Sequence, residues 1–145
     1  NQRPDRVCLQ TTFSDSLAHR IEAGSDLFLM PSLYEPCGLN QLYSLRYGTV
    51  PVVRATGGLA DTICDATPEN IDQSIATGFT FQDYTPEALA HATQRALEIY
   101  YHSPDKWNKI VERGMVQDWS WSKSAQAMLD VYHRARRFAS EEGRL

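Results

Sequence analysis

The chain has 145 residues, of which 42% are hydrophobic and 22% are charged, and this length and composition predict one soluble globular domain with its own core. A net charge of -4, without a run of basic residues, argues against a nucleic-acid-binding protein. The sequence contains no apolar run near the roughly 18 residues that a membrane span needs.

Four strands are predicted, because four short runs are rich in apolar or β-branched residues, at residues 7–12, 27–30, 50–54 and 78–81. The run at 27–30 has four consecutive apolar residues, which is typical of a strand buried on both faces of a parallel sheet. Pro51 lies near the start of its strand, where a missing N–H donor does least harm.

Helices are predicted from capping residues and helical spacing at residues 15–23, 38–47, from 57 onward, 85–101, 103–116 and 122–138. Leu39, Leu42, Tyr43 and Leu45 are expected to bury a stripe of the second helix. Residues 65–73 are polar and are expected to form a surface loop, and residues 140–145 a frayed tail.

Strands that alternate with helices at this spacing predict an α/β fold, with a parallel sheet and helices on both of its faces. In open α/β sheets, ligands bind outside the carboxyl ends of the strands. Phe13, the 35–40 loop and the 56–59 loop each follow a predicted strand. We therefore expect these three segments to share one edge of the sheet.

Residues 35–40 are the strongest candidate for a functional loop. Because a residue before proline is pushed out of the helical region, Glu35 is expected to be extended, with its carboxylate projecting. Gly38 is expected to open the next helix and to let a ligand approach its first free N–H groups, where the helix dipole favours negative charge. Thr56, Gly57 and Gly58 repeat this arrangement after the following strand.

Each of these residues also has a plainer explanation. Gly38 could serve only a tight turn, and Glu35 could be an ordinary solvated carboxylate. Cys37 has no histidine near it in the sequence, which favours a small buried residue over a nucleophile. Neither glycine stretch matches the dinucleotide fingerprint or the phosphate loop with its lysine. The histidines, His19, His91, His102 and His133, are expected to be surface residues or to have their hydrogen bonds satisfied. The tryptophans, Trp107, Trp119 and Trp121, could stack on sugar faces, but packing between the C-terminal helices or against a second domain is favoured.

The three cysteines, Cys8, Cys37 and Cys64, are odd in number and lack metal-ligand spacing. This favours a reducing compartment over a disulfide framework and argues against a zinc site. Residues 1–5 are neither a signal peptide nor a translation start, so we expect the chain to be a fragment of a longer protein.

Residues 34–62, YEPCGLNQLYSLRYGTVPVVRATGGLADT, closely resemble bacterial glycogen synthase and plant starch synthase. The resemblance extends back through residues 19–26 and forward to Asp-Trp-Ser-Trp at 118–121. It implies the GT-B fold, in which two Rossmann-like domains enclose the site in a cleft. Residues 1–145 would then be the later part of the C-terminal, nucleotide-sugar-binding domain, with additional C-terminal helices.

The resemblance implies retaining transfer of glucose from ADP-glucose to the 4-hydroxyl of an α-1,4-glucan, in glycogen or starch biosynthesis, without a metal or other cofactor. Glu35 would contact donor-sugar hydroxyls and stabilise an oxocarbenium-like transition state, and Phe13 would stack on the adenine. The remaining substrate-binding residues would be Cys37, Gly38, Leu39, Asn40, Thr56, Gly57 and Gly58.

Three positions depart from the family pattern. Tyr43 stands where the wider superfamily has a second glutamate, Asn40 where threonine is usual, and Phe13 where tyrosine is usual. The resemblance implies that the lysine and arginine that hold the donor phosphates in this family would lie upstream of residue 1, so the fragment alone is expected to be inactive.

Two alternatives concern activity and assembly. The chain could be a non-catalytic nucleotide-sugar or glucan-binding module that kept the half-fold. An early helix with an exposed apolar face could also pair with itself and give a homodimer. The expected location is the cytoplasm, or the plastid stroma if the protein comes from a plant.

Overall fold

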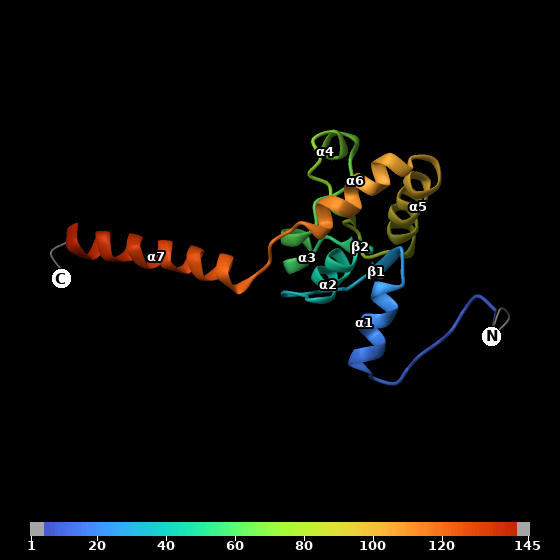
Figure 1. Cartoon of the computed structure of the whole chain (residues 1–145), viewed down its shortest axis with the longest axis horizontal. Helices are drawn as coiled ribbons and strands as arrows, with labels where there is room; N and C mark the ends of the chain where they lie inside the picture. Colours follow the sequence, from blue (N-terminus) through green and yellow to red (C-terminus); the bar gives the residue numbers. More distant parts are fainter. Residues whose placement is uncertain (1–4, 142–145) are drawn as a thin grey trace.

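The computed structural model describes residues 5–141 as a three-stranded sheet with seven helices, the last of which extends away from the body (Figure 1). The elements in chain order are α1 (Asp15–Ala23), β1 (Leu27–Met30), α2 (Asn40–Tyr47), β2 (Val50–Arg54), α3 (Gly57–Thr62), α4 (Pro68–Asp72), β3 (Phe79–Phe81), α5 (Pro86–His102), α6 (Pro104–Met115) and α7 (Trp121–Glu141). None of the helices in the described range is both long and apolar enough to cross a membrane.

The sheet is parallel, with the order β1-β2-β3. Val52 and Val53 of the central strand are both 0% exposed and face opposite sides, because successive strand side chains alternate. Helices α5 and α6 cover the Val52 side, where the core includes Phe79, Ala92, Ala96, Trp107 and Ile110. Helices α2 and α3 cover the other side, with Leu45, Leu59 and Ile63. The predicted α/β architecture is confirmed.

The predicted first strand is wrong, because residues 7–12 form an irregular stretch that runs away from the body (Figure 1). Its sequence has high β propensity, but that propensity measures how well a side chain fits a pleated, half-buried surface. Leu9 is 82% exposed, so no such surface lies beneath it.

Strand β1 is less buried than its apolar run predicts. It lies at the edge of the three-stranded sheet, and Leu29 is 47% exposed. The prediction of burial on both faces is therefore wrong for the described chain. Pro51 lies at the second position of β2, opposite Phe28, near the strand start as expected.

Helix α2 ends where predicted but buries a different face. Gly48 adopts the left-handed conformation at φ 83°, which glycine tolerates at a helix end. The predicted apolar stripe is confirmed for Leu45, which is buried, but is wrong for Leu39 and Tyr43, which are 55% and 38% exposed. The buried residues of α2 are Gln41, Ser44 and Leu45.

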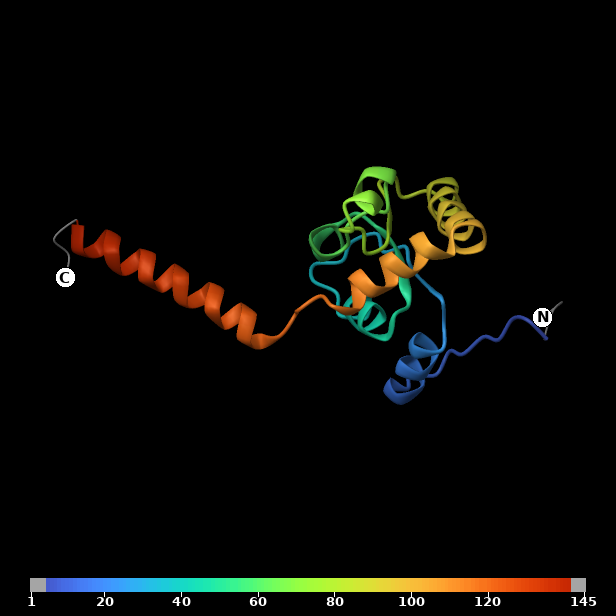
Figure 2. The same ribbon diagram turned by 45° about the horizontal axis from the view of Figure 1, so that its top comes forward.

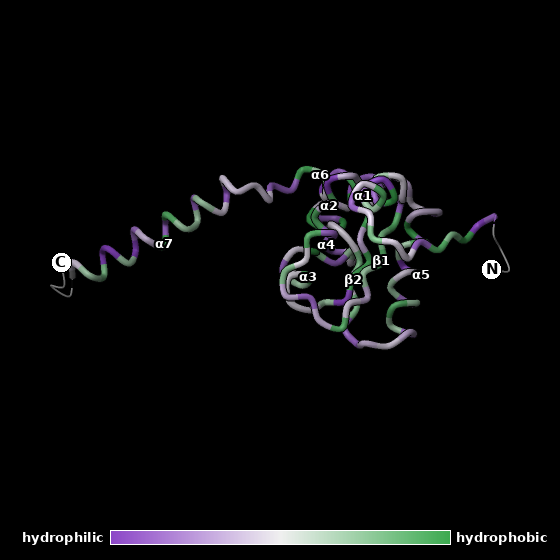
Figure 3. Tube along the Cα trace, turned by 90° about the horizontal axis from the view of Figure 1, so that it is seen from below, coloured by the Kyte–Doolittle hydropathy of each residue, from purple (hydrophilic) through white to green (hydrophobic). Residues whose placement is uncertain are grey.

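Helix α7 projects from the body as a straight arm after α6 (Figures 1 and 2). Hydrophilic and hydrophobic residues alternate along it (Figure 3), and its predicted apolar residues, such as Met128 and Tyr132, are exposed. The helix continues through residue 141, past the predicted end at 138. The rest of the predicted frayed tail, residues 142–145, lies outside the described residues.

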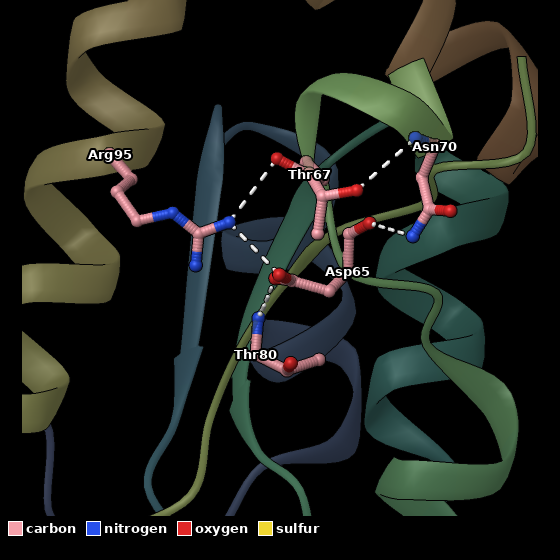
Figure 4. Close-up of polar contacts among 6 residues, drawn as sticks. Asp65, Thr67, Asn70, Thr80 and Arg95 are labelled. Carbon is pink, nitrogen blue, oxygen red and sulfur yellow. Dashed lines mark hydrogen bonds and ion pairs between the residues drawn. The ribbon is translucent and has the colours of Figure 1, made fainter. Parts of the chain in front are cut away.

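The predicted surface loop at 65–73 is partly an anchor between β3 and α5 (Figure 4). The Asp65 carboxylate accepts a 2.7 Å hydrogen bond from the Thr80 N–H and a 3.0 Å contact from the Arg95 guanidinium. The Asn70 side chain donates to the Asp65 carbonyl at 2.8 Å, and Thr67 caps the short helix α4. This network of hydrogen bonds fixes the loop. The sequence had indicated only a polar surface loop here and no anchoring role for these residues.

Candidate functional site

Two loops at the carboxyl ends of β1 and β2 are in direct contact. The Gly58 N–H donates to the Glu35 carbonyl at 3.0 Å. A Cβ at Gly57 would overlap the Glu35 carbonyl, and one at Gly58 would overlap the Cys37 carbonyl. Gly57 also has φ 46°, which disfavours other residues. The predicted meeting of the 35–40 and 56–59 loops is confirmed, and the glycines permit it by lacking side chains.

The start of α2 presents free backbone donors. Gly38 has φ 73° and precedes the helix by two residues, so it shapes the approach to the helix and does not open it. Leu39 is the N-cap and makes no side-chain capping bond. Among the hydrogen bonds of residues 5–141, none is donated by the backbone N–H of Gly38, Leu39 or Asn40. Such a helix end attracts anions, because its free N–H groups coincide with the positive end of the dipole.

A buried glutamine, which sequence reasoning missed, holds this loop from below. Gln41 is 0% exposed, and its Nε2 donates to the carbonyls of Cys37 and Gly38, each at 3.1 Å. The same nitrogen lies 3.3 Å from the Thr62 hydroxyl, which ties the loop to α3. A Cβ at Gly38 would overlap the Gln41 side chain. The sequence feature that could have predicted this role is a polar residue, Gln41, about one helical turn after Gly38.

Glu35 is half-buried in the loop, and its carboxylate takes part in no hydrogen bond or ion pair within the described chain. A carboxylate that the surrounding protein leaves unpaired is free to accept hydrogen bonds from ligand hydroxyls. The carboxylate and the free N–H groups of α2 belong to one short loop, only three to five residues apart in sequence.

Cys37 differs from its predicted environment. It is exposed, so the expectation of a small buried residue is wrong. Its expected backbone role agrees with the structure, because its carbonyl accepts from Gln41 and packs against Gly58. Asn40 is exposed at the first turn of α2, and Thr56 is the N-cap of α3 without a side-chain capping bond.

Phe13 stands apart from the two loops. It lies in the irregular stretch before α1 and is 93% exposed. Ser14, the next residue, caps α1 by accepting from the Leu17 N–H. Among residues 5–141 no hydrogen bond or aromatic contact involves Phe13, so the structure does not bring this predicted site residue together with the others.

Arg54 is a further polar residue that sequence reasoning did not single out. It ends β2, and its Nη1 donates to the Leu33 carbonyl at 2.6 Å. Its Nε donates to the Gln82 carbonyl at 3.0 Å, and its guanidinium lies 5.7 Å from the centre of the Tyr84 ring. The signal in the sequence was a charged residue at the end of a buried apolar strand.

Beside α2, the His19 ring contacts Tyr43 and lies 3.3 Å from the Tyr47 hydroxyl, so this histidine is satisfied, as expected. Glu22, which lies on α1 with His19, is buried. This burial raises the pKa of the Glu22 carboxyl, and the charge of His19 partly offsets the effect. His19, Tyr43 and Tyr47 thus contribute to the contact between α1 and α2.

The tryptophans divide between packing and exposure. Trp107 packs between helices, as predicted, and meets the Tyr100 ring at 5.0 Å. Trp119 and Trp121 are 43% and 89% exposed, so neither packs between helices of the described chain.

Comparison with known families decides the relationship. The family model described as glycosyl transferases group 1 matches residues 5–114, which include β1, β2, β3 and both site loops. The chain belongs to this family. Its members among the most similar curated proteins are glycogen synthases.

The chain is 61% identical over 133 residues to a glycogen synthase from Rhodopirellula baltica, which covers 92% of this chain and 26% of the relative. It is 56% identical over 129 residues to one from Thioalkalivibrio sulfidiphilus, covering 89% and 26%. The chain therefore spans about a quarter of the length of the curated relatives it matches. The predicted resemblance to glycogen synthase is confirmed.

A solved structure extends the comparison to three dimensions. The catalytic domain of starch synthase IV from Arabidopsis thaliana, bound to ADP and acarbose, superposes with a TM-score of 0.82 and 39% identity. The match covers 92% of this chain and 27% of that one. The parallel sheet flanked by helices matches the GT-B glycosyltransferase fold of this starch synthase neighbour.

Proposed function

We propose that this group 1 glycosyl transferase chain supplies the donor-binding part of a glycogen or starch synthase. The reaction would transfer glucose from ADP-glucose to the non-reducing end of an α-1,4-glucan with retention of configuration. The observation that carries the proposal is that the free N–H groups of Gly38, Leu39 and Asn40 belong to the same short loop as the unpaired Glu35 carboxylate. The similarity to glycogen synthases from several bacteria supports it.

In this proposal the start of α2 receives the diphosphate of the donor. Negative charge grows on that diphosphate as the bond to glucose breaks, so donors fixed in advance stabilise the transition state more than the ground state. Gly38 has no side chain to cover the N–H groups, and Gln41 keeps the loop in place from the buried side. The Asn40 side chain adds a further donor.

Glu35 would act on the sugar. Its carboxylate would accept hydrogen bonds from donor hydroxyls and stabilise the positive charge that develops at the anomeric carbon. Thr56 offers a hydroxyl that caps nothing, and Gly57 and Gly58 allow its loop to lie against the Glu35 loop. The exposed Phe13 ring is available to stack on the adenine.

In this proposal, other parts of the full-length enzyme would complete the active site. Residues 1–145 would form the later part of a C-terminal domain, with the acceptor site and the cationic phosphate ligands on other segments, so this chain alone would be inactive. The proposed reaction uses no metal or cofactor. A reducing compartment, the cytoplasm or plastid stroma, suits Cys8, Cys37 and Cys64, which are all free thiols.

The test is Glu35→Ala in a full-length glycogen synthase that carries this chain, such as the R. baltica relative with its matched 133 residues replaced. The assay is incorporation of glucose from ADP-glucose into glycogen. Loss of one transition-state contact predicts a fall in kcat of at least about a hundredfold. Glu98→Ala, an exposed glutamate on α5, is the matched control and is expected to keep full activity.

Near-normal activity of the Glu35→Ala enzyme would remove Glu35 from the mechanism. If the isolated chain also bound a glucan tightly, a non-catalytic binding module would be the better explanation. Millimolar or absent binding of ADP by the isolated chain fits the proposal, because most of the site would lie elsewhere.

A further inference from the structure

Arg54 connects the loops that follow all three strands. It is the last residue of β2, and its guanidinium donates to a carbonyl in the loop after β1 and to another in the loop after β3. The Tyr84 ring, also after β3, lies against the guanidinium. A single side chain therefore spans the carboxyl edge of the sheet, where the two site loops meet.

The hydrogen bond from Arg54 to the Leu33 carbonyl is important because the two halves of the loop after β1 are anchored unequally. The second half of the loop has several anchors, with Gly58 bonding Glu35 and Gln41 bonding Cys37. Residues 31–34 have a single anchor, because the bond from Arg54 to the Leu33 carbonyl is the only hydrogen bond of the described chain that involves any of these four residues. Leu33 is 64% exposed and Tyr34 is 70% exposed, so packing does not fix this half of the loop.

On the basis of the function proposed above, we propose that Arg54 is a positioning residue, which acts on the reaction through Glu35 and does not touch the donor. Its bond to Leu33 holds the backbone two residues before Glu35, and thereby sets where the carboxylate stands relative to the sugar. Displacement of a reacting group by about 1 Å is enough to cost on the order of a hundredfold in rate.

The chemistry of arginine suits this task. The planar guanidinium presents several N–H donors in fixed directions, so it can bond two carbonyls on different loops at once and still lie against an aromatic ring. A lysine has one compact ammonium on a flexible stem, which cannot reproduce the two-sided contact. The conservative variant should therefore restore only part of the function.

The experiment uses Arg54→Met, Arg54→Lys, Glu35→Ala and the double variant Arg54→Met/Glu35→Ala in the full-length chimeric enzyme. Arg113→Met, an exposed arginine on α6 whose side chain makes no hydrogen bond or ion pair within residues 5–141, is the matched control. For each variant kcat, the dissociation constant for ADP and Tm are measured.

Arg54→Met is expected to lower kcat by about 10- to 100-fold. The dissociation constant for ADP should stay within about twofold, because the N–H groups of α2 are held by Gln41 and not by Arg54. Arg54→Lys should recover part of kcat. In the Glu35→Ala background, Arg54→Met should cause no further loss, since a residue that acts only through Glu35 has nothing left to position.

The opposite results separate the two proposals. If Glu35→Ala impairs the enzyme but Arg54→Met does not, the role of Arg54 is refuted and the proposed function stands. If the losses from Arg54 and Glu35 multiply, or if ADP binding weakens in step with kcat, Arg54 acts on its own and the inference is wrong. If Glu35→Ala itself is fully active, the proposed function fails together with this inference.

Discussion

Gly58→Ala offers a prediction whose sign can be worked out from the structure. An added Cβ would overlap the carbonyl group of Cys37, and the obstacle is backbone that cannot rotate away. Gly58 has an ordinary φ, so the variant suffers no left-handed strain and the close approach of the loops is the only penalty. The Gly58 N–H bond to the Glu35 carbonyl, 3.0 Å long, would stretch as the loops separate.

Two free energies oppose each other in this variant. Gly58 lies inside α3, where alanine is favoured over glycine by about 1 kcal/mol. Overpacking of a tight contact costs about 1 to 3 kcal/mol, so the net effect is expected to be destabilising. Because the loop that moves carries Glu35, kcat should fall by at least about a hundredfold.

The assay is Tm by differential scanning calorimetry together with glucose incorporation in the full-length chimeric enzyme. Gly24→Ala is the control, because a Cβ there would lie 3.2 Å from the Arg20 carbonyl, a much milder contact, away from the two loops. A Gly58→Ala enzyme with raised Tm and normal kcat would mean that helix propensity wins. The two loops would then not need to touch, and the steric reasoning would be refuted.

Three other predictions concern stability and reactivity. Asp65→Ala should lower the stability of the fold by about 2 to 4 kcal/mol, because it leaves the Thr80 N–H and the half-buried Arg95 guanidinium without their carboxylate partner. The loss should be measured as a fall in Tm, and an unchanged Tm would contradict the prediction. Because burial raises the pKa of Glu22 above 4.5, its ionisation costs stability as pH rises, so Glu22→Gln should raise Tm at pH 7 and lose this advantage as pH falls toward 4.5. An advantage that grew at low pH would reverse the sign of the reasoning. Burial and, to a smaller extent, the charge of Asp65 raise the pKa of the Cys64 thiol. At pH 8 a disulfide reagent should therefore modify Cys64 more slowly than the exposed Cys37, and equal rates would contradict this prediction.

The features that could be predicted from the sequence depend on neighbouring residues. Thr85 caps α5 by accepting from the Ala88 N–H, and the proline that follows it starts the helix. Gly48 ends α2 because it reaches the left-handed conformation at little cost. The meeting of the two glycine loops is the exception, because it joins residues far apart in the chain; it was predictable since the carboxyl ends of neighbouring parallel strands lie at the same edge of a sheet.

The features that could not be predicted depend on distant partners. Residues 7–12 have strand-like composition, but a strand needs a neighbouring surface that the pattern alone does not supply. The buried role of Gln41 depends on carbonyls that turn toward it only after the loop has folded. Arg54 depends on loops 21 and 28 residues away in the chain, so its sequence position gave no sign of its partners.

The most direct test of the proposed donor site is a crystal structure of the full-length chimeric enzyme with ADP bound. We predict that diphosphate oxygens lie about 2.7 to 3.2 Å from at least two of the backbone nitrogens of Gly38, Leu39 and Asn40. An ordered diphosphate bound elsewhere, with these three N–H groups facing only water, would contradict the proposal.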